Sequence, residues 1–292
     1  MKHLKLNEFV LKIFAIIFMS LDHIGIFLIN FSSNNDFSNP QYMCGYIFKC
    51  FGRLAFPLFV LMLVEGIRHS SNVYKYLLRI GIITTIVMIS EIIIYYFIST
   101  DIEGAYSPLI DLFLCALTLI LIKRKDKFSL FAVIPIGYLV FTFVIQIYES
   151  INNATAIFLP FYIRPGYSLL GLALSLLFYF SYDIVEISAK KKGVDIEEFK
   201  PTLAFQNLVN ITQISFLLIV NIIIYICYTI GFGSKAFWLN DPIQTWSIFA
   251  SLFIFFYNGK RGYNKKWFQY ATYLYFPMHI IIIFLIFFLI YY

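Results

Sequence analysis

The chain has 292 residues, of which 61% are hydrophobic, 20% aromatic and only 13% charged. Long apolar stretches recur from one end to the other, and a water-soluble globule could not bury so much apolar surface. The composition therefore excludes a soluble protein and predicts an integral membrane protein. The net charge of +6 does not indicate nucleic-acid binding, because the basic residues fall in short segments between apolar stretches, where they set topology.

Apolar segments long enough to span a bilayer follow one another along the chain. We expect about nine of them, at residues 9–30, 45–66, 77–98, 106–122, 129–148, 166–182, 207–230, 241–257 and 268–290. A further apolar stretch at 154–166 is too short to span, and lies along the outer interface or dips in as a re-entrant segment. The prediction is an all-α, polytopic membrane helical bundle of about nine or ten transmembrane helices, folded as a single domain over residues 1–292.

The basic residues predict the orientation of the bundle. If the N-terminus is cytoplasmic, 18 of the 22 Lys and Arg residues fall on the inner side and 4 do not. Cytoplasmic loops carry such an excess of Lys and Arg. We therefore expect the N-terminus inside and, with an odd number of spans, the C-terminus outside.

Titratable residues interrupt several predicted spans. A charged side chain near the bilayer centre costs roughly 2.5–3.5 kcal/mol on insertion scales, so such residues usually face a protein-lined cavity and mark function. The set consists of Asp22, His23, Arg53, Glu91, Asp111 and His279. For Glu91 and Asp111, an ion pair that holds helices together is an equally good interpretation.

The two histidines of this set are expected at similar depth. His23 and His279 each lie about 18–21 Å along a helix that runs from inside to outside, which is near the midplane. Asp22 and His23 are about 100° apart around their helix and cannot face each other. Each therefore needs a partner from another span, for which Arg53 and His279 are candidates. Tyr275 shares the face of His279.

These residue types suit proton transfer in a dry pocket. A buried imidazole can accept a proton from an incoming nucleophile. Arg53 never deprotonates, but its guanidinium can stabilise an oxyanion or hold a phosphate or carboxylate. Glu65, Arg68 and His69 lie at the inner boundary, where we expect solvated anchors of a loop.

Four stretches of sequence resemble the TraX family. They are "LKIFAIIFMSLDHIG" at 11–25, "GRLAFPLFVLMLVEGIRHSSNVYKYLLRIGI" at 52–82, "ISE" at 89–91 and "KWFQYATYLYFPMHIIII" at 266–283. The shared features are an Asp-His pair in the first span, an Arg before Ala-Phe-Pro and then Glu-Gly in the second, and Tyr-Phe-Pro-x-His near the end. Between residues 100 and 260 the resemblance is one of hydrophobic character.

The resemblance implies a membrane acetyltransferase related to the transmembrane acyltransferases, in a bacterial plasma membrane. Its donor would be acetyl-CoA or another acyl-CoA from the cytoplasm, and its acceptor an amine or hydroxyl group on a protein N-terminus, a glycan or a lipid. Neither a metal nor a nucleic acid is expected. The residues that match the family's motifs are Asp22, His23, Arg53, Glu65, Arg79, Glu91 and His279.

We accordingly expect an acyl-CoA-dependent O- or N-acyltransferase with His23 as general base, assisted by Asp22, Arg53 and His279. The expected contacts to the donor's phosphates are Arg68, Lys75 and Arg79, and the other buried polar residues are Glu65, Glu91, Asp111 and Arg164. The alternative is a transporter or flippase that uses the same charges as a substrate and proton relay. A third possibility is a non-catalytic protein whose charges only pair helices.

Overall fold

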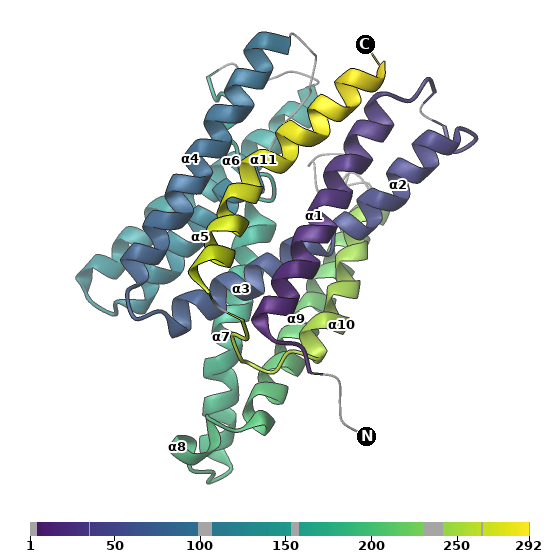
Figure 1. The fold of residues 1–292 in the computed structure, drawn as a ribbon. Coiled ribbons are helices and arrows are strands. Elements are labelled where there is room, and N and C mark those ends of the chain that lie inside the picture. Colours follow the sequence, from purple (N-terminus) through teal and green to yellow (C-terminus); the bar gives the residue numbers. More distant parts are fainter. Residues whose placement is uncertain are drawn as a thin grey trace. The chain divides into compact units, whose positions relative to one another are not determined.

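The computed structural model describes residues 5–34, 36–98, 107–152, 158–230, 242–263 and 265–291. The described chain is helical and contains no β-strand, which confirms the all-α prediction. Its α-helices are α1 (Glu8–Asn30), α2 (Pro40–Gly52), α3 (Ala55–His69), α4 (Val73–Ile98), α5 (Pro108–Lys123), α6 (Val133–Asn152), α7 (Leu169–Lys191), α8 (Ile196–Phe199), α9 (Leu203–Thr229), α10 (Ala250–Phe255) and α11 (Lys266–Tyr291) (Figure 1). Short 3-10 helices are η1 (Lys127–Ala132), η2 (Phe161–Ile163) and η4 (Pro242–Phe249).

Seven helical segments within the described ranges are long and apolar enough to cross a membrane, so the chain is a polytopic membrane protein. The remaining two predicted spans form shorter helices, α5 and the η4–α10 segment. The 16 residues of α5 extend only about 24 Å, less than the ~30 Å hydrocarbon core. Eight of them are buried, so neighbouring protein encloses much of this short helix.

The predicted second span, 45–66, is two helices rather than one. Arg53 and Leu54 form a turn between α2 and α3, although Arg53 itself keeps helical angles, with φ of −61° and ψ of −19°. Pro57 explains the break, because it has no N–H to donate to the carbonyl of Arg53, four residues earlier. The first turn of a helix tolerates such a proline, so α3 starts again directly after the break. Arg53 therefore occupies a junction instead of a helix interior.

Internal contacts divide the chain into two compact units. Unit 1 contains residues 1–59, 184–221 and 243–292, and unit 2 contains residues 60–183 and 222–242. A single transmembrane domain stays a prediction.

In unit 1 a short stretch of paired backbone sets the register of the first and last helices. The Leu6 N–H donates to Phe256 O at 2.8 Å, and the Glu8 N–H donates to Lys260 O at 2.8 Å. Gly262 follows with φ of 69°, a conformation that favours glycine. As a result α1 and α11 begin at the same level and run beside each other (Figure 1).

Helix α2 packs against the other side of α1 through two glycines. A Cβ atom on Gly25 of α1 would lie 2.6 Å from the carbonyl oxygen of Gly45 of α2, which is too close for any side chain. Small residues allow membrane helices to bring their backbones together in this way. Asn39 caps the start of α2 by accepting the Gln41 N–H at 2.9 Å, and Pro40 occupies the first turn.

Unit 2 contains an irregular segment that protein encloses. The predicted short stretch 154–166 is described from residue 158 onward, and residues 164–168 are all buried. Ser107 forms an isolated bridge with Pro165, and the Tyr138 hydroxyl donates to Ile163 O at 2.8 Å. Irregular backbone at membrane depth requires such protein cover, because lipid cannot satisfy its polar groups.

Candidate functional site

The imidazoles of His23 and His279 lie side by side in unit 1. Their ring centroids are 5.0 Å apart, with 56° between the ring planes. His23 comes 15 residues after the start of α1, and His279 comes 13 residues after the start of α11. These positions correspond to about 22 and 20 Å along two helices that start level, so the shared depth follows from the register of unit 1.

One nitrogen of His279 is held by the backbone and the other is buried. Nδ1 lies 2.9 Å from the carbonyl oxygen of Tyr275, and since a carbonyl can only accept, Nδ1 carries the hydrogen. In the neutral ring Nε2 is then an acceptor. His279 is 4% exposed, and Nε2 has no hydrogen-bond partner among the described residues. The site thus contains a buried lone pair.

Two further side chains complete this cluster. The ring of Tyr275 stacks on that of His279, with centroids 5.1 Å apart and an angle of 8° between planes. Its hydroxyl lies 2.5 Å from Ser20 Oγ. Because Ser20 Oγ donates to Ile16 O at 2.7 Å, the tyrosine hydroxyl is the donor in this contact. Sequence reasoning missed Ser20, although its position three residues before His23 places it on the same helix face.

Asp22 and Arg53 form an ion pair between α1 and the junction of α2 and α3. Their side chains are only 19% and 8% exposed. Asp22 and His23 are neighbours on α1 but contact different residues. Asp22 pairs with Arg53, and His23 lies beside His279. The sequence named these partners as candidates, and the structure brings both pairs together.

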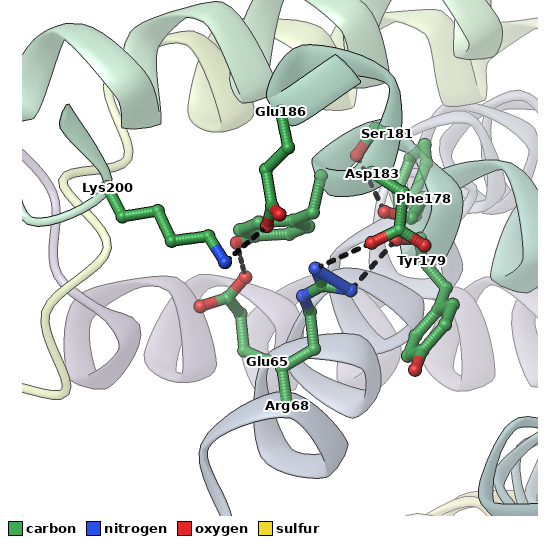
Figure 2. A network of polar contacts seen from close by, with 9 residues as sticks. Glu65, Arg68, Phe178, Tyr179, Ser181, Asp183, Glu186 and Lys200 are labelled. Atoms are coloured by element: carbon green, nitrogen blue, oxygen red, sulfur yellow. Dashed lines mark hydrogen bonds and ion pairs between the residues drawn. The ribbon is translucent and has the colours of Figure 1, made fainter. Parts of the chain in front are cut away.

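Glu65 and Arg68 belong to a polar network of unit 2 (Figure 2). Arg68 donates to Asp183 Oδ1 at 3.2 Å and to Tyr179 O at 3.3 Å. Glu65 is 3% exposed and accepts a hydrogen bond from the Tyr182 hydroxyl. The expectation of a buried polar residue is confirmed for Glu65 and that of a solvated anchor is wrong, because α7 covers it. Figure 2 also draws a separate ion pair of unit 1, that of Lys200 with Glu186 at 2.8 Å.

The predicted donor-binding residues differ in their surroundings. Arg68 already faces the carboxylate of Asp183. Lys75 and Arg79 are exposed in the first turns of α4. Glu91 lies within α4, but its side chain is outside the described part of the structure.

Asp111 caps a helix instead of forming an ion pair. Its carboxylate accepts the backbone N–H of Tyr167 at 2.9 Å and of Ser168 at 2.6 Å, just before α7 begins. Ser168 has φ of 43°, so these bonds hold a strained turn. The ion-pair interpretation was wrong for Asp111, because the free amides at a helix start are themselves suitable partners for a carboxylate.

Arg164 holds the enclosed segment of unit 2. Its Nη1 donates to both carboxylate oxygens of Glu149, each at 2.8 Å, and its Nε donates to Leu159 O at 2.8 Å. The side chains of Arg164 and Glu149 are 6% and 12% exposed. This buried pair fastens the 158–168 segment to α6, which is a structural role.

Comparisons with known proteins give a family and a relative. A model of the family described as TraX protein matches residues 8–287. Over 79 residues the chain is 38% identical to a protein of Dichelobacter nodosus named probable fimbrial assembly protein FimC, serogroup H1. That match covers 27% of this chain and 29% of the relative's length. No solved structure matches the chain.

Proposed function

The chain belongs to the TraX family and is a multi-pass membrane protein, and we propose that its paired histidines catalyse acyl transfer. The donor is acetyl-CoA or another acyl-CoA from the cytoplasm, and the acceptor is an amine or hydroxyl group. The observation that carries this proposal is the buried acceptor nitrogen of His279 beside the ring of His23. A general base requires such a lone pair within reach of the substrate.

The reaction proceeds by proton removal and displacement. His279 Nε2 takes the proton from the acceptor, whose nitrogen or oxygen attacks the thioester carbonyl carbon. The carbon–sulfur bond then breaks, and the CoA thiolate leaves. It takes the proton from the imidazolium of His279, so that CoA is released as the free thiol and the imidazole is neutral again. Because Nδ1 of His279 donates to the Tyr275 carbonyl, its Nε2 is free to accept a proton. We therefore assign the role of base to His279 instead of the expected His23, and His23 orients the acceptor.

The remaining residues position this pair. The ion pair of Asp22 and Arg53 fixes α1 next to His23, and Tyr275 holds the ring of His279 from one side. Lys75 and Arg79 stay the predicted contacts to the donor's phosphates, because they are exposed and basic. Arg68 is less suitable for binding phosphate, since its charge is already paired with that of Asp183.

The acceptor and the membrane belong to the same proposal. The name of the fimbrial relative supports a protein subunit of a surface filament as the first acceptor to test, before a glycan or a lipid. Family membership and the excess of basic residues on one side support the plasma membrane of a bacterium.

Release of CoA thiol tests the proposal. We expect purified protein in detergent to release thiol from acetyl-CoA, and His279→Ala to lower the rate about 10²–10⁴-fold, as loss of a general base does. His69→Ala is the matched control, because that histidine is exposed and lies outside the pair. The proposal fails if His279→Ala is as active as the parent protein. It also fails if the parent neither releases thiol nor binds acetyl-CoA in equilibrium dialysis.

A further inference from the structure

Helix α4 carries an open apolar groove in unit 2. The groove has a volume of about 610 Å³ and is lined by α4 from Tyr74 to Ile86, including Leu78, Gly81 and Thr85, and by Phe113 of α5. Gly81 has no side chain, so the ring of Phe113 comes to 3.1 Å from where a Cβ atom would be and closes the floor. The groove therefore runs along α4 and is bounded by α5.

The two threonine hydroxyls of the groove are satisfied by the backbone of α4. Thr84 Oγ1 and Thr85 Oγ1 donate to the backbone oxygens of Ile80 and Gly81, each at 2.9 Å. Their hydroxyl hydrogens are thus used within the helix. The lining offers carbon atoms to an occupant, which suits a hydrocarbon chain.

The length of the groove matches one membrane leaflet. Tyr74 and Ile86 are the first and last lining residues of α4, and the rise between them is about 18 Å. Half of the hydrocarbon core measures about 15 Å. One acyl chain of a lipid from the adjacent leaflet fits this depth.

One end of the groove is basic. The Tyr74 hydroxyl accepts a hydrogen bond from Arg124 Nη1 at 2.9 Å, which ties the groove to the turn that follows α5. We call Arg124 and Lys125 of this turn, together with Lys127 at the start of η1, the basic rim. All three are exposed. Asp126 is the one acidic residue between Arg124 and Lys127, and it is paired with Arg124. Lys125 and Lys127 leave a net positive charge in the basic rim.

From this arrangement we propose that the groove and the basic rim bind an anionic phospholipid. One acyl chain lies along α4 between Tyr74 and Ile86, and the phosphate lies against Lys125 and Lys127. Basic pockets between membrane helices on the cytoplasmic side recognise anionic head groups in this way. The site lies within unit 2 and does not depend on the acyl transfer proposed for the histidine pair of unit 1.

Lipid titration followed by native mass spectrometry tests the site. Delipidated protein in detergent receives phosphatidylglycerol or phosphatidylcholine with identical acyl chains. We expect at least about tenfold tighter binding of phosphatidylglycerol, from the charge of the rim. Glycerol 1-phosphate and inorganic phosphate, which have no acyl chain, are expected neither to bind nor to compete.

Paired variants separate the contribution of the groove, which holds the acyl chain, from that of the charged basic rim. Thr85→Trp fills the groove at an exposed position and is expected to abolish lipid binding, whereas Val144→Trp, exposed on α6 outside the groove, retains it. The double variant Lys125→Gln/Lys127→Gln is expected to lower phosphatidylglycerol binding to the level of phosphatidylcholine. The double variant Lys191→Gln/Lys192→Gln removes as much exposed charge elsewhere and is expected to change nothing.

Two results would overturn the proposal. The first is equal binding of the two lipids by the parent protein. The second is unchanged binding by Thr85→Trp. Each variant is first shown to be monodisperse by size-exclusion chromatography, and Leu78→Trp, at another exposed lining position, replaces Thr85→Trp if the latter aggregates.

Discussion

Asp22 and Arg53 place opposite charges inside the apolar part of unit 1. Removal of one partner leaves the other charge buried, so Asp22→Ala and Arg53→Ala are each expected to lower the free energy of unfolding by about 3–5 kcal/mol. The double variant Asp22→Ala/Arg53→Ala is expected to lose less than the sum of the two single losses, because it buries no unmatched charge. Unfolding in mixed micelles with increasing SDS measures all three. Additive losses would show that the two side chains are not coupled.

The residues of the site that could be predicted are those with a titratable side chain in an apolar stretch of sequence. Asp22, His23, Arg53 and His279 are titratable groups in apolar sequence, and their cost in a membrane marks them without a structure. Ser20 carries no such cost, because a helical serine can satisfy its hydroxyl within its own helix, as it does with Ile16 O. The tautomer of His279 depends on a local hydrogen bond that sequence cannot show.

Helix register explains why the two histidines meet. The backbone pairing of residues 6–8 with residues 256–260 starts α1 and α11 at one level. Gly262 adopts its positive φ beside Asn7, and a Cβ atom there would lie 2.4 Å from Asn7 Cγ. Asn7 cannot simply move, because its side chain caps α1 by accepting the Val10 N–H at 3.1 Å.

Gly262→Ala is therefore expected to destabilise the protein more than Gly193→Ala does. Both glycines have positive φ, which costs about 1–2 kcal/mol for alanine. A Cβ atom on Gly193 meets no atom of the described structure within 4 Å, so that variant is a control for backbone strain alone. Thermal unfolding in detergent compares the two variants. Equal losses would contradict a role of Gly262 in holding Asn7 and the helix start.

Hydropathy predicted the existence of the helices better than their form. Each of the predicted spans falls on a described helix, but the break at Arg53 was missed, since a proline in a first helical turn is normally tolerated. Residues 164–168 are buried, in line with the protein-covered alternative expected for 154–166, but the side chains that cover this segment were beyond prediction. Its cover comes from side chains distant in sequence, such as Tyr138 and Asp111.

At the scale of the whole molecule, the predicted orientation links the donor to one side of the membrane. In unit 1 the N-terminal segment pairs with residues 256–261, and a Cβ atom on Gly259 would contact Gln206 near the start of α9. Basic residues cluster at these ends, at Lys200, Lys260 and Arg261. This shared end supports the predicted cytoplasmic N-terminus. The acyl-CoA of the proposed reaction could not cross the bilayer, so the proposal requires it to reach the protein from that side.

Transfer of label from [1-14C]acetyl-CoA in membrane vesicles tests the central claim most directly. Inverted vesicles, which expose the cytoplasmic face, are expected to bind label covalently in their protein, glycan or lipid fraction. Right-side-out vesicles are expected to bind none, and inverted vesicles with His279→Ala at least about a hundredfold less than the parent. Label recovered only as a solute that detergent releases from the vesicle lumen would contradict acyl transfer and indicate transport.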